Sequence, residues 1–282
     1  MATLLPEGNH VQLDDTMSVH YLDFPAEGAA DGQTIVMIHG SGPGASGWSN
    51  FKQNVAPLTA AGHRVVIYDQ PGYGFTSKPT DAIYDLDYFC KYLGGLLDHL
   101  TIKNCCLVGN SLGGAVAIGF ALANPERVSS LILMAAGGLE EREVYFRTDG
   151  IQAMVKYPMG SPEFTRDVLQ QLLKLLVHDP VHITDALIDE RWEILQQQNS
   201  QVLVSMSIPN LCDRLGELQC PILGFWGTED KFCPVSGAEH LYRNCANVEV
   251  NVRSRCGHWV MVEYADDFNR QSIDFLRRER HG

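Results

Sequence analysis

The chain has 282 residues, with 21 Lys and Arg against 34 Asp and Glu, which gives a formal net charge of −13 at pH 7. A hydrophobic fraction of 45% and a charged fraction of 20% are ordinary for a globular chain, and the length suits one large domain. The acidic balance argues against a nucleic-acid binder, and no run reaches the roughly 18 consecutive apolar residues of a membrane helix.

The N-terminal segment, MATLLPEGNHVQLDD, has neither a basic start nor a long apolar run, so we expect no signal peptide. The eight cysteines never form C-x-x-C, which argues against a zinc site. We therefore predict free thiols and a cytoplasmic location, with Cys105 and Cys106 as small core residues.

The first two segments, 10–15 and 17–24, alternate around Asp15 and Thr16 and predict an antiparallel hairpin. Near-continuous apolar runs then predict strands buried on both faces of a parallel sheet. These runs lie at 34–39, 64–69, 104–108, 130–135 and 221–226, with a more polar candidate at 248–252 near the sheet edge. Helical patterns occupy about 48–60, 86–100, 112–124, 236–244 and 265–279. The alternation predicts an α/β fold with helices on both faces of a mostly parallel sheet.

The alternation stops between residues 138 and 209, where only helical periodicity remains. One stretch repeats apolar residues at Phe164, Val168, Leu172 and Leu176, and DALIDERWEILQQQ follows it. We expect a helical cap at 138–209, inserted between core segments 1–137 and 210–282. Such a cap would cover the carboxyl edge of the strands, where open α/β sheets bind ligands.

Residues 109–113 match G-x-S-x-G directly after a predicted strand and before a predicted helix. This context predicts a strained elbow that exposes the Ser111 hydroxyl as a nucleophile. The alternative is a helix that begins with Ser111 as an ordinary N-cap.

A serine needs a histidine to take its proton and an acid to orient that histidine. Asp230 and His258 follow Ser111 in the order that this elbow predicts, each just after a predicted strand. We predict that the three form a catalytic triad. Asp230 has an alternative as a helix N-cap, and Glu229 competes for its role.

The loop after the first core strand contains GPGASG, a literal G-x-G-x-x-G, and Asp69 ends the next strand. This is close to a dinucleotide-binding fingerprint, but Pro43 has no N–H to offer a pyrophosphate. With a triad present, we interpret the loop as half of an oxyanion hole, with the backbone N–H groups of Ser41 and Leu112 as donors.

Six segments together resemble the meta-cleavage product hydrolases, which are carbon–carbon bond hydrolases of the α/β-hydrolase family. The segments are HGSGPGASGWSNF, DQPGYGFTSKP, LVGNSLGGAVAI, DERWEIL, FWGTEDKFCP and RCGHWVMVEYADDFNR, and the resemblance covers nearly the whole chain. It implies the α/β-hydrolase fold and hydrolysis of 2-hydroxy-6-oxo-hexa-2,4-dienoates, ring-fission products of aromatic catabolism. The products are 2-hydroxypenta-2,4-dienoate and a carboxylic acid. It further implies a homo-oligomer and no metal or organic cofactor.

The resemblance also assigns a substrate site. It places around the dienoate end of the substrate Gly42, Asn50, Asn110, Arg191 and Trp259. It places in a distal pocket, beyond C6 of the substrate, Leu176, Phe232 and Cys233. An Arg fork suits a carboxylate, but Arg191 also has Glu190 and Glu193 nearby and would fit a solvated helix face.

The three distal residues would fit an ordinary core equally well. Two arginines at the start of the cap, Arg142 and Arg147, fit solvated charge better than a ligand site.

Two rival functions use the same residues. A carboxylesterase would keep the triad and change the substrate, and a nucleotide-dependent oxidoreductase would use GPGASG and Asp69.

Overall fold

The computed structural model describes residues 5–28 and 32–279. Its centre is an eight-stranded sheet in the order β1-β2-β4-β3-β5-β6-β7-β8. Strands β3 to β8 run parallel, while β1 pairs antiparallel with β2 and β2 with β4. The strand bounds are β1 (Asn9–Asp14), β2 (Met17–Phe24), β3 (Thr34–Ile38), β4 (Arg64–Tyr68), β5 (Cys105–Asn110), β6 (Val128–Met134), β7 (Ile222–Gly227) and β8 (Val248–Arg253).

Two hydrophobic clusters lie on opposite faces of this sheet, because successive residues of a strand point to opposite sides. In β3, Val36 and Ile38 belong to one cluster, and Ile35 and Met37 belong to the other. Both sets are fully buried, which explains the continuous apolar runs of the central strands.

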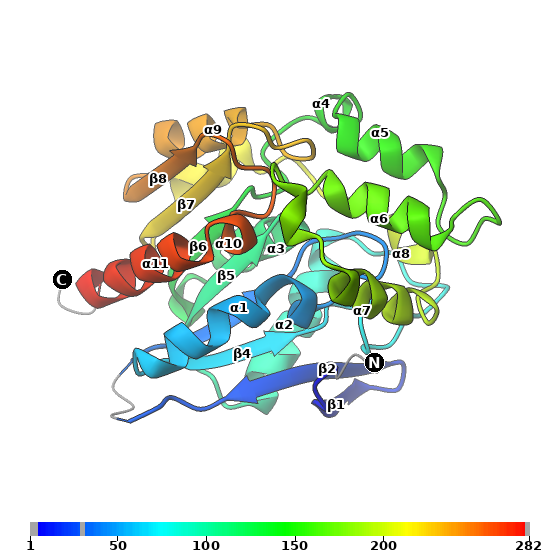
Figure 1. Ribbon diagram of the computed structural model, residues 1–282. Helices are drawn as coiled ribbons and strands as arrows, with labels where there is room; N and C mark the ends of the chain where they lie inside the picture. Colours follow the sequence, from blue (N-terminus) through cyan, green and yellow to red (C-terminus); the bar gives the residue numbers. More distant parts are fainter. Residues whose placement is uncertain (1–4, 29–31, 280–282) are drawn as a thin grey trace.

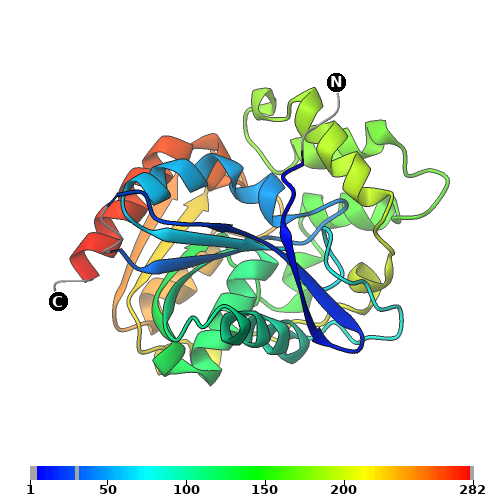
Figure 2. The same ribbon diagram turned by 90° about the horizontal axis from the view of Figure 1, so that it is seen from below.

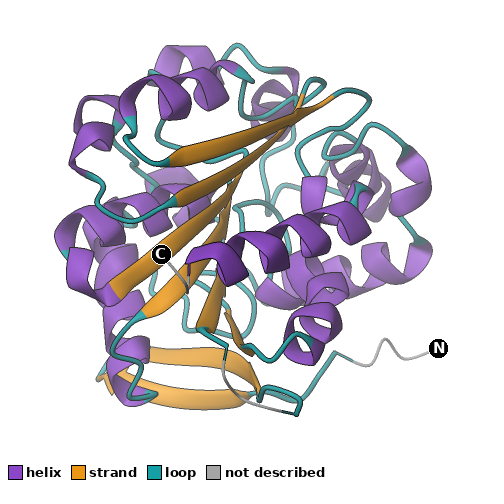
Figure 3. Ribbon diagram, turned by 90° about the vertical axis from the view of Figure 1, so that its left-hand side faces the viewer, coloured by secondary structure: helices purple, strands orange, loops and turns teal. Residues whose placement is uncertain are grey.

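Helices cover both faces, as Figures 2 and 3 show. One face is covered by α1 (Gly47–Ala60), α10 (Val260–Glu263) and α11 (Ala265–Glu279). The other is covered by α2 (Leu86–His99), α3 (Leu112–Ala123) and α9 (Ser236–Asn244), with a short 3-10 turn η1 (Pro125–Arg127) after α3. The predicted hairpin, parallel sheet and five core helices are therefore confirmed, with ends shifted by up to two residues.

The segment between β6 and β7 contains only helices and short turns (Figure 1). These are α4 (Arg142–Tyr145), α5 (Asp149–Lys156), α6 (Arg166–Lys174), η2 (Pro180–His182), α7 (Asp185–Leu195), α8 (Gln201–Ser205) and η3 (Cys212–Glu217). A single bridge between Asp85 and Ser207 is its one strand-like pairing in the described chain. The helical content agrees with prediction, although Phe164 and Leu176 flank α6 and lie outside it.

All eight cysteines are unpaired, and Cys105 and Cys106 are buried in the core as predicted. Within residues 5–28 and 32–279, no helix has the length and apolar character needed to cross a membrane. The same residues contain no group of three or more His, Cys, Asp and Glu side chains placed to hold a metal ion.

Candidate active site

Ser111 stands at a sharp turn between β5 and α3, with φ 55° and ψ −118°. Few residues other than glycine adopt a positive φ, so the turn is strained. The turn is possible because glycines on both sides of Ser111 leave room for the neighbouring backbone. A Cβ on Gly113 would lie 2.0 Å from the Ile38 carbonyl oxygen, and one on Gly109 would lie 2.4 Å from the Gly113 oxygen. This is the nucleophile-elbow geometry that the motif predicts.

The Ser111 side chain does not cap α3, although Ser111 occupies the N-cap position. Its Oγ instead lies 4.0 Å from Cys233 Sγ, and the described residues show no hydrogen bond from Ser111 to His258. Catalytic hydrogen bonds are often long before substrate binds, so this geometry is compatible with a nucleophile. The ordinary N-cap alternative has no support from these contacts.

His258 and Asp230 form a tight buried pair. His258 Nδ1 lies 2.7 Å from Asp230 Oδ2, and His258 is 3% exposed. The other carboxylate oxygen, Asp230 Oδ1, accepts hydrogen bonds from the backbone N–H groups of Phe232 and Cys233. Asp230 thus holds a proton on His258 Nδ1 and leaves Nε2 free to act as a base.

The neighbouring Glu229 has a different partner. Its Oε2 lies 2.5 Å from His178 Nδ1, and its side chain is 45% exposed. Asp230, not Glu229, therefore orients His258. Asp230 is also no helix cap, because α9 begins only at Ser236.

The loop after β3 is held in shape by His39. Its Nδ1 donates to the Gly40 oxygen at 2.7 Å, and its Nε2 accepts from the Gln70 N–H at 3.0 Å. Burial lowers the pKa of His39 to about 4, so the ring is neutral and both bonds persist at neutral pH. A Cβ on Gly40 would lie 3.2 Å from Ser111 Cβ, so this loop runs directly beside Ser111.

The two predicted oxyanion donors flank Ser111. Ser41 follows Gly40 in that loop, and Leu112 is the first residue of α3. The N–H groups in the first turn of a helix have no acceptor within the helix, so the Leu112 N–H is available to a developing oxyanion.

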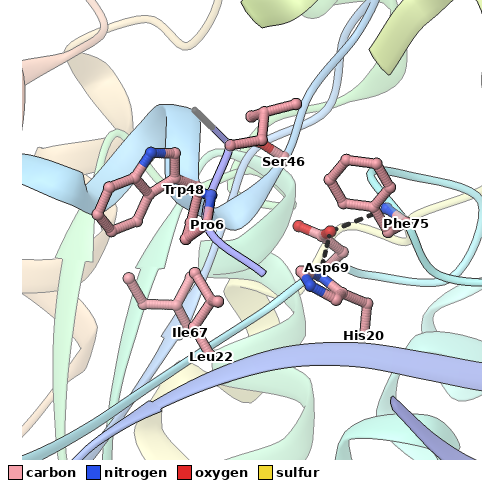
Figure 4. A pocket seen from close by; sticks show the side chains of 9 residues that line it. Pro6, His20, Leu22, Ser46, Trp48, Ile67, Asp69 and Phe75 are labelled. Carbon is pink, nitrogen blue, oxygen red and sulfur yellow. Dashed lines mark hydrogen bonds and ion pairs between the residues drawn. The ribbon is translucent and has the colours of Figure 1, made fainter. Parts of the chain in front are cut away.

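The dinucleotide interpretation requires Asp69 to bind a ribose. Asp69 is only 3% exposed, however, and its carboxylate already has partners within the protein. Its carboxylate accepts from the N–H groups of Gly47 and Phe75 and pairs with His20 Nδ1 at 2.8 Å. The pocket beside it, shown in Figure 4, has a volume of about 10 Å³, roughly the room for one water molecule. Asp69 braces the loop and is not free to bind a ribose.

Asn50 and Asn110 lie side by side behind Ser111. Asn50 Nδ2 donates to Asn110 Oδ1 at 3.1 Å, and both residues are buried. Asn110 Nδ2 donates in turn to the Met134 oxygen and, at 3.4 Å, to the His258 oxygen. The pair connects α1, the elbow and the histidine loop.

Arg191 reaches the same place from α7 and is only 2% exposed. Its Nε donates to the Pro43 oxygen and its Nη1 to Ser49 Oγ, both at 3.2 Å. Its guanidinium lies 5.7 Å from the centre of the Trp259 ring. Arg191 is therefore no solvated surface residue, in contrast to the alternative that the sequence left open.

No described carboxylate forms an ion pair with Arg191, although the group is charged. Burial lowers the pKa of Arg191 to about 10, and the nearby Glu190 opposes this shift. Glu190 itself pairs with Lys52 Nζ at 2.6 Å. A buried cation without an anionic partner is costly, so the site is suited to an anionic ligand.

The predicted distal residues lie next to the triad. Phe232 and His258 have ring centres 5.2 Å apart, and Cys233 approaches Ser111 as described above. Leu176 accepts a hydrogen bond at its backbone oxygen from the Trp259 N–H at 3.0 Å. All three are less than 10% exposed and belong to the hydrophobic core clusters.

Two residues that hold the site together were not predicted. Glu263 accepts from the N–H groups of Gly257, His178 and Asp179, and so ties the histidine loop to the segment after α6. Gln198 accepts from the Gly44 N–H at 2.7 Å. Their types are common on surfaces, and only the fold brings them to these loops.

Comparison with known proteins agrees with this geometry. Residues 35–271 match the alpha/beta hydrolase family. The chain is 36% identical to a 2-hydroxy-6-oxo-6-phenylhexa-2,4-dienoate hydrolase of Comamonas testosteroni, over 92% of this chain and 91% of that protein. It is 38% identical to a 2-hydroxy-6-oxononadienedioate/2-hydroxy-6-oxononatrienedioate hydrolase of Paraburkholderia xenovorans, over 93% and 92%.

Among solved structures, a meta-cleavage product hydrolase from Pseudomonas fluorescens superposes with a TM-score of 0.81 at 29% identity. The match covers 96% of this chain and 98% of that one. Sequence, fold and the arrangement around Ser111 lead to one conclusion: the chain belongs to the α/β-hydrolase family and, within it, to the meta-cleavage product hydrolases.

Proposed function

We propose that this enzyme hydrolyses the C5–C6 bond of 2-hydroxy-6-oxo-hexa-2,4-dienoates in the breakdown of aromatic compounds. The observation that carries the proposal is Arg191, a buried cation without a carboxylate partner among the described residues, in the same site as Ser111 and the His258–Asp230 pair. A simple ester carries no carboxylate, so an esterase has no need of such a cation. A dienoate carries a carboxylate, which would be the anionic partner of Arg191.

The residues divide the reaction into two stages. Arg191, Asn50 and Asn110 hold the dienol end while it ketonises, which turns that end of the substrate into an electron sink. His258 then assists attack on the C6 carbonyl by Ser111 or by water, and the N–H groups of Ser41 and Leu112 stabilise the oxyanion. The C–C bond then breaks, and the leaving carbon takes up the proton that His258 accepted, which releases 2-hydroxypenta-2,4-dienoate. The remaining part leaves as the carboxylic acid, directly if water attacked, or after a water molecule hydrolyses the ester on Ser111.

Residues 138–209 act in this proposal as the cap that closes the site over the core at 1–137 and 210–282. Two contacts support it. A Cβ on Gly44 would lie 2.0 Å from the Arg191 backbone oxygen, and one on Gly150 would lie 2.5 Å from Phe232. The helical segment therefore packs against loops that follow β3 and β7, at the carboxyl edge of the sheet.

We further propose that the group attached to C6 is apolar. Leu176, Phe232 and Cys233 offer no cation, and the negative charges of Asp230 and Glu140 add to the burial that raises the pKa of the Cys233 thiol. Arg142 and Arg147 are exposed, and Arg142 lies over the Phe146 ring. A second carboxylate at C6 would thus meet apolar and negative surroundings.

A substrate pair tests both proposals. The ultraviolet-visible decay of the 6-phenyl dienoate is compared with that of the 6-carboxyethyl analogue. We expect kcat/KM at least tenfold higher for the phenyl compound. Equal values, or preference for the second carboxylate, would contradict the apolar pocket. No decay of either compound, with fast turnover of a simple aryl ester, would contradict C–C hydrolysis itself.

The family resemblance also supports a homo-oligomer, and the eight free thiols suit a reducing cytoplasm. Light scattering of the purified protein tests the first point: a monomeric mass at micromolar concentration would rule it out.

A further inference from the structure

Tyr73 carries a polar group that no step above uses. Its side chain is 0% exposed, and its hydroxyl proton has no acceptor among the described residues. A buried hydroxyl without a partner costs about 1–3 kcal/mol of stability. Such a group in a native structure needs an explanation, and a hydrogen bond to a bound substrate is one.

The position of Tyr73 relates it to the substrate site. The turn that contains it is bonded to the loop after β3, since the Gly74 N–H donates to the Ala45 oxygen at 3.0 Å. Its ring meets the His39 ring edge to face, with centres 5.4 Å apart. Burial raises the pKa of Tyr73, while the Arg191 guanidinium and the Gly42 N–H act against that rise. The phenol oxygen is therefore on the side of Gly42 and Arg191 and keeps its proton at neutral pH.

Arg191 has donor capacity left at the same point. Its Nε and Nη1 are bonded to Pro43 and Ser49, whereas Nη2 makes no hydrogen bond to a described residue. A Cβ on Gly42 would lie 3.5 Å from Nη2, so this donor lies within van der Waals range of the loop at Gly42. The Tyr73 hydroxyl, a neutral donor, and Arg191 Nη2, a charged donor, thus both remain unused near Gly42.

We propose that the Tyr73 hydroxyl donates a hydrogen bond to the substrate carboxylate that Arg191 holds. Tyr73 is then a specificity residue for the acid end of the dienoate. The inference rests on the proposed function, because it concerns how the same substrate is recognised. An unpartnered hydroxyl alone would not suffice. Tyr68 also has a buried hydroxyl without a partner among the described residues. The titratable group that influences the pKa of Tyr68 is Cys90 of α2, however, and not Arg191.

The test compares Tyr73→Phe with Tyr68→Phe, which removes an equally buried, equally unpartnered hydroxyl. We expect Tyr73→Phe to raise KM for the 6-phenyl dienoate about tenfold and to change kcat less than twofold, because the bond is made in both ground and transition states. With the methyl ester of the same dienoate, which lacks the carboxylate, KM of Tyr73→Phe should equal that of the wild type. Neither variant should lower the unfolding midpoint, and Tyr68→Phe should leave KM unchanged.

A binding probe separates this inference from the proposed function. Hexa-2,4-dienoate has the carboxylate and the diene but no bond to cleave, and its Kd is measured by calorimetry. We expect about tenfold weaker binding to Tyr73→Phe, whether or not the wild type turns over dienoates. Unchanged Kd and KM in Tyr73→Phe, or an equal loss with the methyl ester, would overturn the role of Tyr73.

Discussion

At the scale of single residues, the site depends on which acid orients His258. Asp230 and Glu229 are adjacent in sequence but face different histidines, and only the folded loop decides between them. The sequence predicted Ser111, Asp230 and His258 from their order and from the strands that precede them. It favoured Asp230 and left Glu229 as a competitor, because both positions satisfy the same pattern.

Asp230→Asn should lower kcat for the dienoate by about 10³-fold or more, because the amide no longer holds the required proton on His258 Nδ1. Glu229→Gln is the matched control and should stay within about threefold of wild type. Steady-state decay of the 6-phenyl dienoate measures both. A larger loss in Glu229→Gln than in Asp230→Asn would reverse the assignment.

Arg191→Gln should lower kcat/KM for the dienoate by about 10²-fold, since charge-assisted hydrogen bonds to a carboxylate contribute roughly 1.5–3 kcal/mol each. Hydrolysis of a neutral aryl ester should change little. Arg166→Gln, at an exposed cap arginine paired with Asp189, serves as the control and should leave both substrates unaffected. Equal losses on acid and ester would show that Arg191 acts only through the fold.

At the scale of elements, the strands and core helices were predictable because burial imposes clear periodicities on them. The cap was harder. The apolar repeat through Phe164 and Leu176 predicted a longer helix than α6, and both residues instead pack from the flanking turns. The short helix α10 was missed, since four residues carry too little pattern. Contacts such as Trp259 to Leu176 join distant segments and leave no local signal.

Glu263 joins two of these elements, and its loss should affect both stability and activity. In Glu263→Gln, an NH2 group replaces one of the two oxygens that accept from Gly257, His178 and Asp179. We expect a loss of about 1–3 kcal/mol in unfolding free energy and a lower kcat, because Gly257 adjoins His258.

Glu249→Gln, at an exposed ion pair with Arg278, is the control and should change stability by less than about 0.5 kcal/mol. Urea unfolding and steady-state kinetics measure the two effects. If Glu263→Gln behaves like this control, the carboxylate does not secure the histidine loop.

At the scale of the whole molecule, the buried His39 makes stability depend on pH. The pKa of His39 is about 4 in the folded protein, against an ordinary value of 6.5. Below pH 6.5 the unfolded chain binds a proton that the folded chain refuses until about pH 4. Stability therefore falls as the pH falls through this window, by roughly 3 kcal/mol in total.

Urea unfolding at pH 7, 5.5 and 4.5 measures this loss. His39→Gln should show a shallower decline over the same range, whereas His99→Gln, at an exposed histidine, should follow the wild type. Parallel declines in all three proteins would show that other groups control the acid response.

The most direct test of C–C hydrolysis is product analysis with 2-hydroxy-6-oxo-6-phenylhexa-2,4-dienoate, in wild type and in Ser111→Ala. We predict that the wild type removes the yellow colour and releases 2-hydroxypenta-2,4-dienoate and benzoate in equal amounts. Ser111→Ala should still bind the substrate but lose at least about 10³-fold in turnover. Colour loss without benzoate, or full turnover in Ser111→Ala, would contradict the account.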